Sequence, residues 1–139
     1  MLIYLLVFSV LYAYARLTID YLYFEPAIKR DIDGFNNLNS EYPCVKINGH
    51  CALYRKGKNS NKVMIIAHGN AGSFLDRGYM FKKLEKYSGD IYLFEYPGFS
   101  GIKGNTNIAN CISELLFWIN HVKPQYKKID LFGESKNIA

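Results

Sequence analysis

The order of apolar and polar residues divides the chain into an apolar start, a polar stretch and a region of alternating elements. Residues 2–15 form an uncharged apolar run, and apolar side chains prevail for several residues beyond it, with Arg16 and Asp20 as the charges. On a helix these two charges share one face, because they are four residues apart, and they can pair near a membrane interface. The pattern predicts a transmembrane anchor over residues 1–24.

Two other interpretations of this segment stay open. Small residues at Ala13 and Ala15 suit a signal peptidase, so the segment could be a signal peptide that is cleaved near Ala15, with the rest secreted. It could also be an ordinary buried helix, although a domain this small rarely surrounds a helix on all sides. Positive charges follow the segment at Arg16, Lys29 and Arg30. By the positive-inside rule we expect a single-pass membrane protein whose domain is cytosolic.

A polar stretch over residues 25–43 predicts a linker between this segment and a domain over residues 44–139. The domain begins with two short strand-like stretches on either side of Asn48-Gly49, a residue pair typical of a two-residue hairpin turn. We expect this hairpin to lie at the periphery of the domain.

The remaining residues alternate between two patterns. Continuous apolar runs predict buried strands over 62–69, 90–96 and 128–133, and helical spacing predicts helices over 73–87 and 107–122. The expected apolar side of the second helix consists of Ile108, Cys111, Ile112, Leu115, Leu116, Trp118 and Ile119. This alternation is typical of an α/β fold, in which crossover helices connect the strands of a parallel sheet.

Composition and charge narrow the possible functions. The chain has 139 residues, of which 50% are hydrophobic, which suits one small folded domain. Its net charge is +5, but the lysines are scattered, which indicates a solvated surface or one that faces an anionic membrane, and not a nucleic-acid-binding protein. Cys44, Cys51 and Cys111 form neither a CxxC pair nor an even disulfide set. With His50 they also lack the spacing of a four-ligand metal site, so we expect free thiols and no metal.

Three loops follow the predicted strands, at the edge where parallel sheets bind ligands: HGNAG at 68–72, YPGFSGIKG at 96–104 and GESKN at 133–137. The sequence lacks a phosphate-binding G-x-x-x-x-G-K-[ST] loop, and G-x-G-x-x-G does not follow the first of these strands, so we expect no nucleotide cofactor.

Acyl transfer fits these loops better. A serine in a tight turn between a strand and a helix exposes its hydroxyl, and backbone N–H groups beside it can stabilise an oxyanion. Ser135 is therefore the candidate nucleophile. The candidate oxyanion donors are the backbone N–H groups of Asn70, Ala71 and Lys136.

The stretch from Lys62 to Ser135 resembles the α/β-hydrolase superfamily, and within it a group of membrane-anchored serine hydrolases. The likeness rests on HGNAG, on Arg77, on the YPGF turn, on Trp118 and on Gly-Glu-Ser after the last strand. It implies the N-terminal part of an α/β-hydrolase fold, no cofactor, and hydrolysis of an ester, thioester or amide in a lipid or an acylated protein. The sequence departs from the family where Ser100 and Asn137 replace glycines and Lys136 replaces an apolar residue.

The triad order of this fold is Ser, then Asp or Glu, then His, and only four residues follow Ser135. The upstream histidines, His50, His68 and His121, are expected to be structural or solvated. We therefore expect a truncated serine hydrolase that is inactive alone, in which the strand before Ser135 is an exposed sheet edge. One alternative is a non-catalytic, membrane-tethered binding or scaffold protein whose partner chain covers this edge. Another is a split enzyme whose second chain supplies the acid and the histidine.

Overall fold

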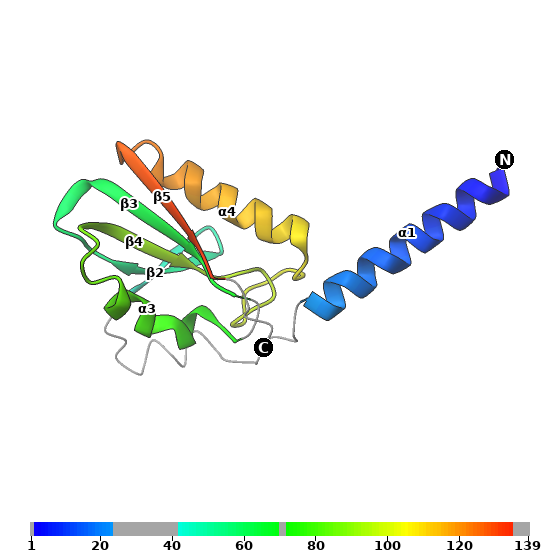
Figure 1. The fold of residues 1–139 in the computed structure, drawn as a ribbon, viewed down its shortest axis with the longest axis horizontal. Coiled ribbons are helices and arrows are strands. Elements are labelled where there is room, and N and C mark those ends of the chain that lie inside the picture. Colours follow the sequence, from blue (N-terminus) through cyan, green and yellow to red (C-terminus); the bar gives the residue numbers. More distant parts are fainter. Residues whose placement is uncertain (1, 24–41, 70–71, 135–139) are drawn as a thin grey trace.

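The first element of the structure is a long helix. The computed structural model describes residues 2–23, 42–69 and 72–134. Helix α1 (Leu2–Tyr23) projects from the rest of the molecule in Figure 1, and its side chains from Leu5 to Leu17 are exposed. Within the described residues, no helix combines the length and the apolar character needed to cross a membrane. The expected helix is confirmed, whereas a membrane-spanning anchor over 1–24 is not. Most of the expected linker over 25–43 lies outside the described residues.

The rest of the chain is a mixed α/β domain built on one five-stranded sheet. Its strands are β1 (Cys44–Ile47), β2 (His50–Arg55), β3 (Asn59–Ala67), β4 (Gly89–Phe94) and β5 (Lys128–Gly133). Their order in the sheet is β1-β2-β4-β3-β5. β3 lies parallel to β4 and to β5, whereas β2 runs antiparallel to both β1 and β4. The three expected parallel strands are confirmed, and the hairpin that precedes them makes the sheet mixed.

The hairpin forms as expected but does not lie where the sequence suggested. Asn48 and Gly49 adopt φ angles of 49° and 87°, the left-handed values that a two-residue turn between antiparallel strands favours. The expected peripheral position is wrong, because β2 pairs with β4 and its residues Cys51, Ala52 and Leu53 are buried. Neighbouring strand residues point to opposite faces, so β2 is covered on both.

The segment expected as one helix over 73–87 consists of two short pieces. A 3₁₀ turn, η1 (Phe74–Arg77), leads into the helix α3 (Gly78–Lys83). Ser73 caps η1 with its hydroxyl, and the carboxylate of Asp76 accepts a hydrogen bond from the backbone N–H of Ser73 at 3.2 Å. This reciprocal capping fixes the start of the segment directly after the first loop.

Helix α4 (Ile108–Val122) lies on the other side of the sheet from α3 (Figure 1). Asn107 caps it by accepting the N–H of Asn110 with its side chain. Trp118 on its inner face is fully buried, and Glu114, unexpectedly, is also buried. Three residues expected on its buried side are instead exposed: Ile108, Ile112 and Leu116. The helix therefore has a second apolar stripe that the sheet does not cover.

The two faces of the sheet carry separate hydrophobic cores. The core on the α3 side consists of Cys51, Leu53, Ile66, Phe74, Met80, Phe81, Ile91 and Leu93. The core on the α4 side consists of Ala52, Val63, Ile65, Tyr92, Phe94, Tyr96, Phe99, Trp118 and Val122. Both cores include residues of β2, β3 and β4, which are the inner strands of the sheet.

Strand β5 is an edge strand, as expected. Among the described residues it pairs with β3 alone. Leu131 is 58% exposed and Phe132 is 41% exposed. Because successive residues point to opposite faces, β5 presents an uncovered apolar side chain on each face of the sheet.

Candidate functional site

The candidate site lies where β3, β4 and β5 end, because parallel strands bring their following loops to one edge of the sheet. All four sequence-predicted positions lie outside the described residues: Asn70, Ala71, Ser135 and Lys136. The structure does describe Gly69, which precedes Asn70, and Glu134, which precedes Ser135. The geometry of the site therefore comes from Gly69, Glu134 and the residues that contact them.

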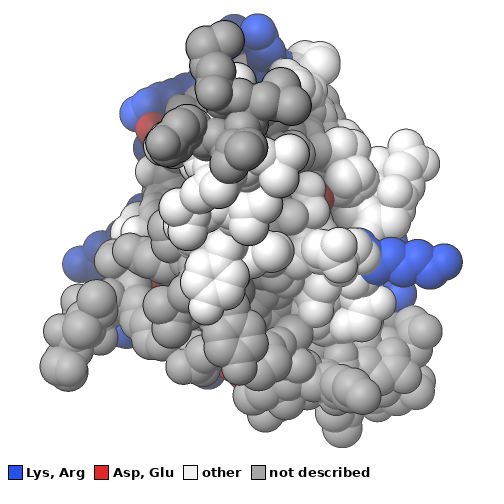
Figure 2. Space-filling view, turned by 90° about the vertical axis from the view of Figure 1, so that its right-hand side faces the viewer, with Lys and Arg blue, Asp and Glu red and all other residues white. Residues whose placement is uncertain are grey.

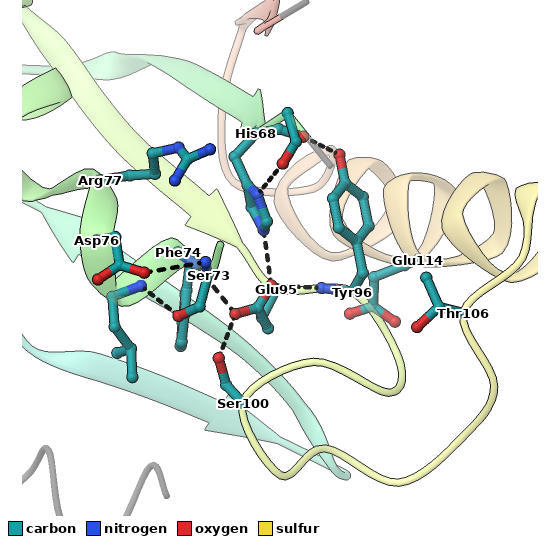
Figure 3. A network of polar contacts seen from close by, with 12 residues as sticks. His68, Ser73, Phe74, Asp76, Arg77, Glu95, Tyr96, Ser100, Thr106 and Glu114 are labelled. Atoms are coloured by element: carbon teal, nitrogen blue, oxygen red, sulfur yellow. Dashed lines mark hydrogen bonds and ion pairs between the residues drawn. The ribbon is translucent and has the colours of Figure 1, made fainter. Parts of the chain in front are cut away.

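Glu95, the residue after β4, is fully buried and connects the first two loops (Figure 3). Its Oε1 lies 2.6 Å from Nε2 of His68 and accepts the backbone N–H of Tyr96 at 3.0 Å. Its Oε2 accepts the backbone N–H of Phe74 at 3.0 Å and the hydroxyl of Ser100. Each carboxylate oxygen thus has two partners, as a buried carboxylate requires.

The contacts of His68 determine where the protons of this pair lie. Nδ1 is 2.7 Å from the carbonyl oxygen of Gly69, which can only accept, so Nδ1 carries a proton. Nε2 faces Oε1 of Glu95, so another proton lies between these two atoms. Because Glu95 accepts three further hydrogen bonds, the arrangement favours an imidazolium paired with a carboxylate. Both side chains are 0% exposed, and the pair joins the first loop to the residue that precedes the second.

The second loop is held by its own side chains. The hydroxyl of Tyr96 donates to the carbonyl of His68 at 2.5 Å, and burial raises the pKa of Tyr96, which keeps this donor protonated. Gly98 has a φ of 88°, and a Cβ there would lie 2.5 Å from Oγ1 of Thr106, so this position requires glycine. Ser100 has a φ of 51°, a conformation that favours glycine. The hydrogen bond that the hydroxyl of Ser100 donates to the carboxylate of Glu95 offsets this strain.

Glu134 connects the third loop to the first. Its Oε2 accepts the backbone N–H of Gly69 at 2.9 Å and Nε–H of Arg77 at 2.8 Å, and its Oε1 accepts the hydroxyl of Tyr79 at 2.8 Å. Partial burial raises the pKa of Glu134, but these three donors outweigh it and lower the pKa to about 2. The backbone N–H of Glu134 also donates to the carbonyl of Ala67 at 2.9 Å. Glu134 is therefore an anion at neutral pH, and its hydrogen bond to Gly69 joins the start of the third loop to the first loop.

A small hollow of about 220 Å³ opens beside Glu134. It is lined by Tyr79, Met80, Lys83, Leu84, Phe132 and Glu134. The exposed ring of Phe132 and the side chains from α3 give it a largely apolar wall, and Lys83 and Glu134 supply the charges. The hollow is smaller than the roughly 300–1,000 Å³ typical of ligand pockets.

The three histidines lie in structural contacts. His68 belongs to the buried pair described above. Nδ1 of His50 is 2.7 Å from Oε2 of the buried Glu114, and its ring stacks on Phe117 with centroids 3.6 Å apart. The ring of His121 lies parallel to that of Phe117, 6.3 Å away. These contacts agree with the structural roles expected for the histidines.

Sequence reasoning did not identify Glu95, Glu114 and Glu134 as the carboxylates that connect distant segments. A local signal exists for two of them. Glu95 and Glu134 directly follow the apolar residues of β4 and the end of β5. A carboxylate at the end of a buried strand has to find hydrogen-bond donors in the neighbouring loops. Glu114 carries no such signal, because it lies within an amphipathic helix.

No model of a protein family, no curated protein and no solved structure matches this chain. Its function therefore has to be inferred from the residues of the three loops and from their contacts.

Proposed function

We propose that this chain is a membrane-attached domain of the serine-hydrolase type, which acts on an ester, thioester or amide, and that its sheet is the N-terminal part of an α/β-hydrolase fold. Ser135 is the proposed nucleophile. The proposed oxyanion donors are the backbone N–H of Lys136 and that of Asn70 or Ala71.

The observation that carries this proposal is the contact between Glu134 and Gly69. These residues directly precede Ser135 and Asn70, and the carboxylate of Glu134 accepts the backbone N–H of Gly69 at 2.9 Å. A nucleophile and its oxyanion donors have to lie within a few ångströms of each other. The contact supports this requirement, because it joins the two loops at the residues next to the proposed groups.

The chemistry also needs a general base. The buried side chain of His68 is engaged with Glu95 and does not fill this role. The acid and the histidine of a triad that follows the order of this fold would come from residues beyond Ser135 or from a second chain. Without a base, a serine hydroxyl is a poor nucleophile at neutral pH. A polypeptide of these 139 residues alone is therefore expected to be inactive.

A fluorophosphonate probe, which reacts with activated serines, tests the proposal. We expect the probe to label the protein at Ser135 in membranes of its natural host and not to label the purified 139-residue polypeptide. Ser135→Ala should abolish the label, and Ser113→Ala, a matched change at an exposed serine of α4, should not. Labelling that persists in Ser135→Ala, or its absence in native membranes, would contradict the assignment.

The proposed membrane attachment rests on α1. Its exposed side chains between residues 5 and 17 include nine large apolar residues: Leu5, Leu6, Val7, Phe8, Val10, Leu11, Tyr12, Tyr14 and Leu17. In Figure 2, seen from the side on which α1 projects, the described residues near the centre are uncharged, and Lys and Arg lie at the periphery. Apolar surface on this scale favours transfer into lipid.

Carbonate extraction of membranes tests the attachment. N-terminal sequencing distinguishes an intact anchor from cleavage near Ala15.

The edge strand favours a second candidate function, a non-catalytic binding or scaffold protein. Leu131 and Phe132 leave apolar surface on both faces of β5, and an exposed edge strand is a template for pairing with another chain. A partner that binds equally well to Ser135→Ala and to the unchanged chain, without any fluorophosphonate label, would support this function. A monodisperse monomer in detergent would count against it.

A further inference from the structure

A second and larger hollow lies at the end of the sheet opposite the three loops. Its volume is about 560 Å³, within the range of sites for small molecules. It opens between the turn that joins β2 to β3 and the end of α3. It is lined by Tyr42, Arg55, Lys56, Gly57, Lys58, Phe81, Lys82, Glu85, Lys86, Tyr87 and Ser88.

One wall is fixed by the close approach of two backbones. The N–H of Gly57 donates to Oδ1 of the buried Asp90 at 2.7 Å, and the N–H of Asn59 donates to the carbonyl of Ser88 at 2.8 Å. A Cβ on Gly57 would lie 2.2 Å from the backbone of Gly89, so the turn sits directly against the start of β4. The turn therefore holds the residues on either side of Gly57 in place.

Arg55 also lines the hollow. Its guanidinium donates to the carbonyls of Phe81, Leu84 and Tyr87 at 3.2, 2.9 and 2.7 Å. These carbonyls belong to the last turn of α3 and the residues that follow it, so Arg55 joins the second wall to the sheet. A guanidinium has five N–H groups, and three of them make these bonds.

The charges around the hollow are unbalanced. Its lining includes Arg55 and four lysines, Lys56, Lys58, Lys82 and Lys86, against one carboxylate, Glu85. None of the four lysines forms an ion pair or a side-chain hydrogen bond with the described part of the chain. In contrast, Lys62 and Lys128 outside the hollow both contact Asp130. Within the described residues the two walls thus carry an excess of positive charge, and a multivalent anion between them would offset it.

We propose that this hollow binds an anion with at least two phosphate groups. Lysines act as point charges and suit phosphates spread over several ångströms, whereas a single carboxylate is recognised better by a free guanidinium fork. A soluble polyphosphate and the phosphorylated headgroup of a membrane lipid share this chemistry. The site is independent of the three loops and of Ser135.

Calorimetric titration of the full chain in an uncharged detergent tests the site. The two probes are pyrophosphate and inositol trisphosphate, the latter as a water-soluble lipid headgroup. The test variants are Lys82→Gln/Lys86→Gln on one wall and Lys56→Gln/Lys58→Gln on the other. The control is Lys123→Gln/Lys127→Gln, which removes the same charge from exposed lysines that do not line the hollow. The fluorescence of Trp118 verifies that each variant is folded.

We expect at least one probe to bind, more weakly as the salt concentration rises. Each test variant should weaken binding about tenfold, since it removes two of the four ammonium groups that line the hollow, and the control should leave binding within about twofold. Tighter binding of pyrophosphate supports a soluble ligand, and tighter binding of inositol trisphosphate supports a lipid headgroup. Binding of neither probe, or equal weakening in test and control variants, would overturn the proposal.

Discussion

Replacing Glu95 with glutamine tests whether the loops at the candidate site depend on a buried charge. Glutamine has nearly the same shape, but its amide offers one acceptor oxygen and one NH₂ group. If the NH₂ group faces His68, the backbone N–H of Tyr96 loses its acceptor. If it faces Ser100, the hydroxyl can rotate to accept, but the backbone N–H of Phe74 loses its acceptor. Either orientation leaves one buried donor unpaired.

These losses allow a magnitude to be worked out. An unpaired buried N–H costs about 1–3 kcal/mol, and removing one partner of a buried ion pair costs about 3–5 kcal/mol. The two costs overlap, because both arise from the loss of the same carboxylate. We expect Glu95→Gln to lower the free energy of unfolding by about 3 kcal/mol, a large part of the roughly 5–15 kcal/mol typical of a domain.

Urea titration of the full chain in mild detergent measures this change. Trp118 is the only tryptophan and is fully buried, so its fluorescence reports unfolding of the α4 core. Glu85→Gln makes the same chemical change at an exposed residue and should alter the free energy of unfolding by less than about 0.5 kcal/mol. A loss below about 1 kcal/mol for Glu95→Gln would refute both the buried ion pair and the four hydrogen-bond partners assigned to the carboxylate of Glu95.

Other predictions concern Glu134 and the glycines. The pKa of Glu134 is lowered from 4.5 to about 2, so the stability it gives is present above its unfolded-state pKa and lost as the pH falls toward 2. The unfolding free energies of the unchanged chain and of Glu134→Gln should differ by about 1 kcal/mol near pH 6, since solvent screens this half-buried group, and should converge as the pH falls to about 2; a constant difference would contradict this. Gly57→Ala should cost more than about 2 kcal/mol, because its Cβ meets backbone at 2.2 Å. Gly78→Ala, whose Cβ meets nothing within 4 Å, should be neutral or stabilise α3 by about 0.5 kcal/mol in the same titration. Gly49→Ala, at a φ of 87°, should lower the thermal midpoint through a cost of about 1 kcal/mol. An unchanged midpoint would show that the turn tolerates a side chain.

Strands were the most predictable part of the fold, because their apolar runs are continuous. The bounds of β5 agree with the predicted 128–133. β3 begins at Asn59, earlier than predicted, because the backbone of this polar residue bonds to Ser88 across the sheet. The place of β2 beside β4 was not predictable, since a strand pattern records burial and not the partner.

Helix α4 shows why an apolar pattern alone does not settle orientation. Ile108, Ile112 and Leu116 lie four residues apart and form a stripe as regular as the buried one. Glu114 is buried instead, because Trp118 donates to its Oε1 at 3.0 Å and His50 contacts its Oε2. His50 lies 64 residues before Glu114 in the chain, and local spacing contains no information about such a partner. At the candidate site, likewise, the sequence predicted the three loops but not the carboxylates of Glu95 and Glu134 that connect them.

The strand order has a consequence for synthesis of the protein. β2 and β3 follow each other in the chain, yet β4 lies between them in the sheet, and both neighbours of β3 come later in the chain. During synthesis the β1–β2 hairpin can form as soon as both strands have left the ribosome. β3 can pair only after β4 or β5 has been synthesised, and such non-local pairing is slow. During this interval the apolar faces of β2 and β3 stay open to chaperones and to other nascent chains. The yield of folded protein is therefore expected to depend on how quickly β4 inserts.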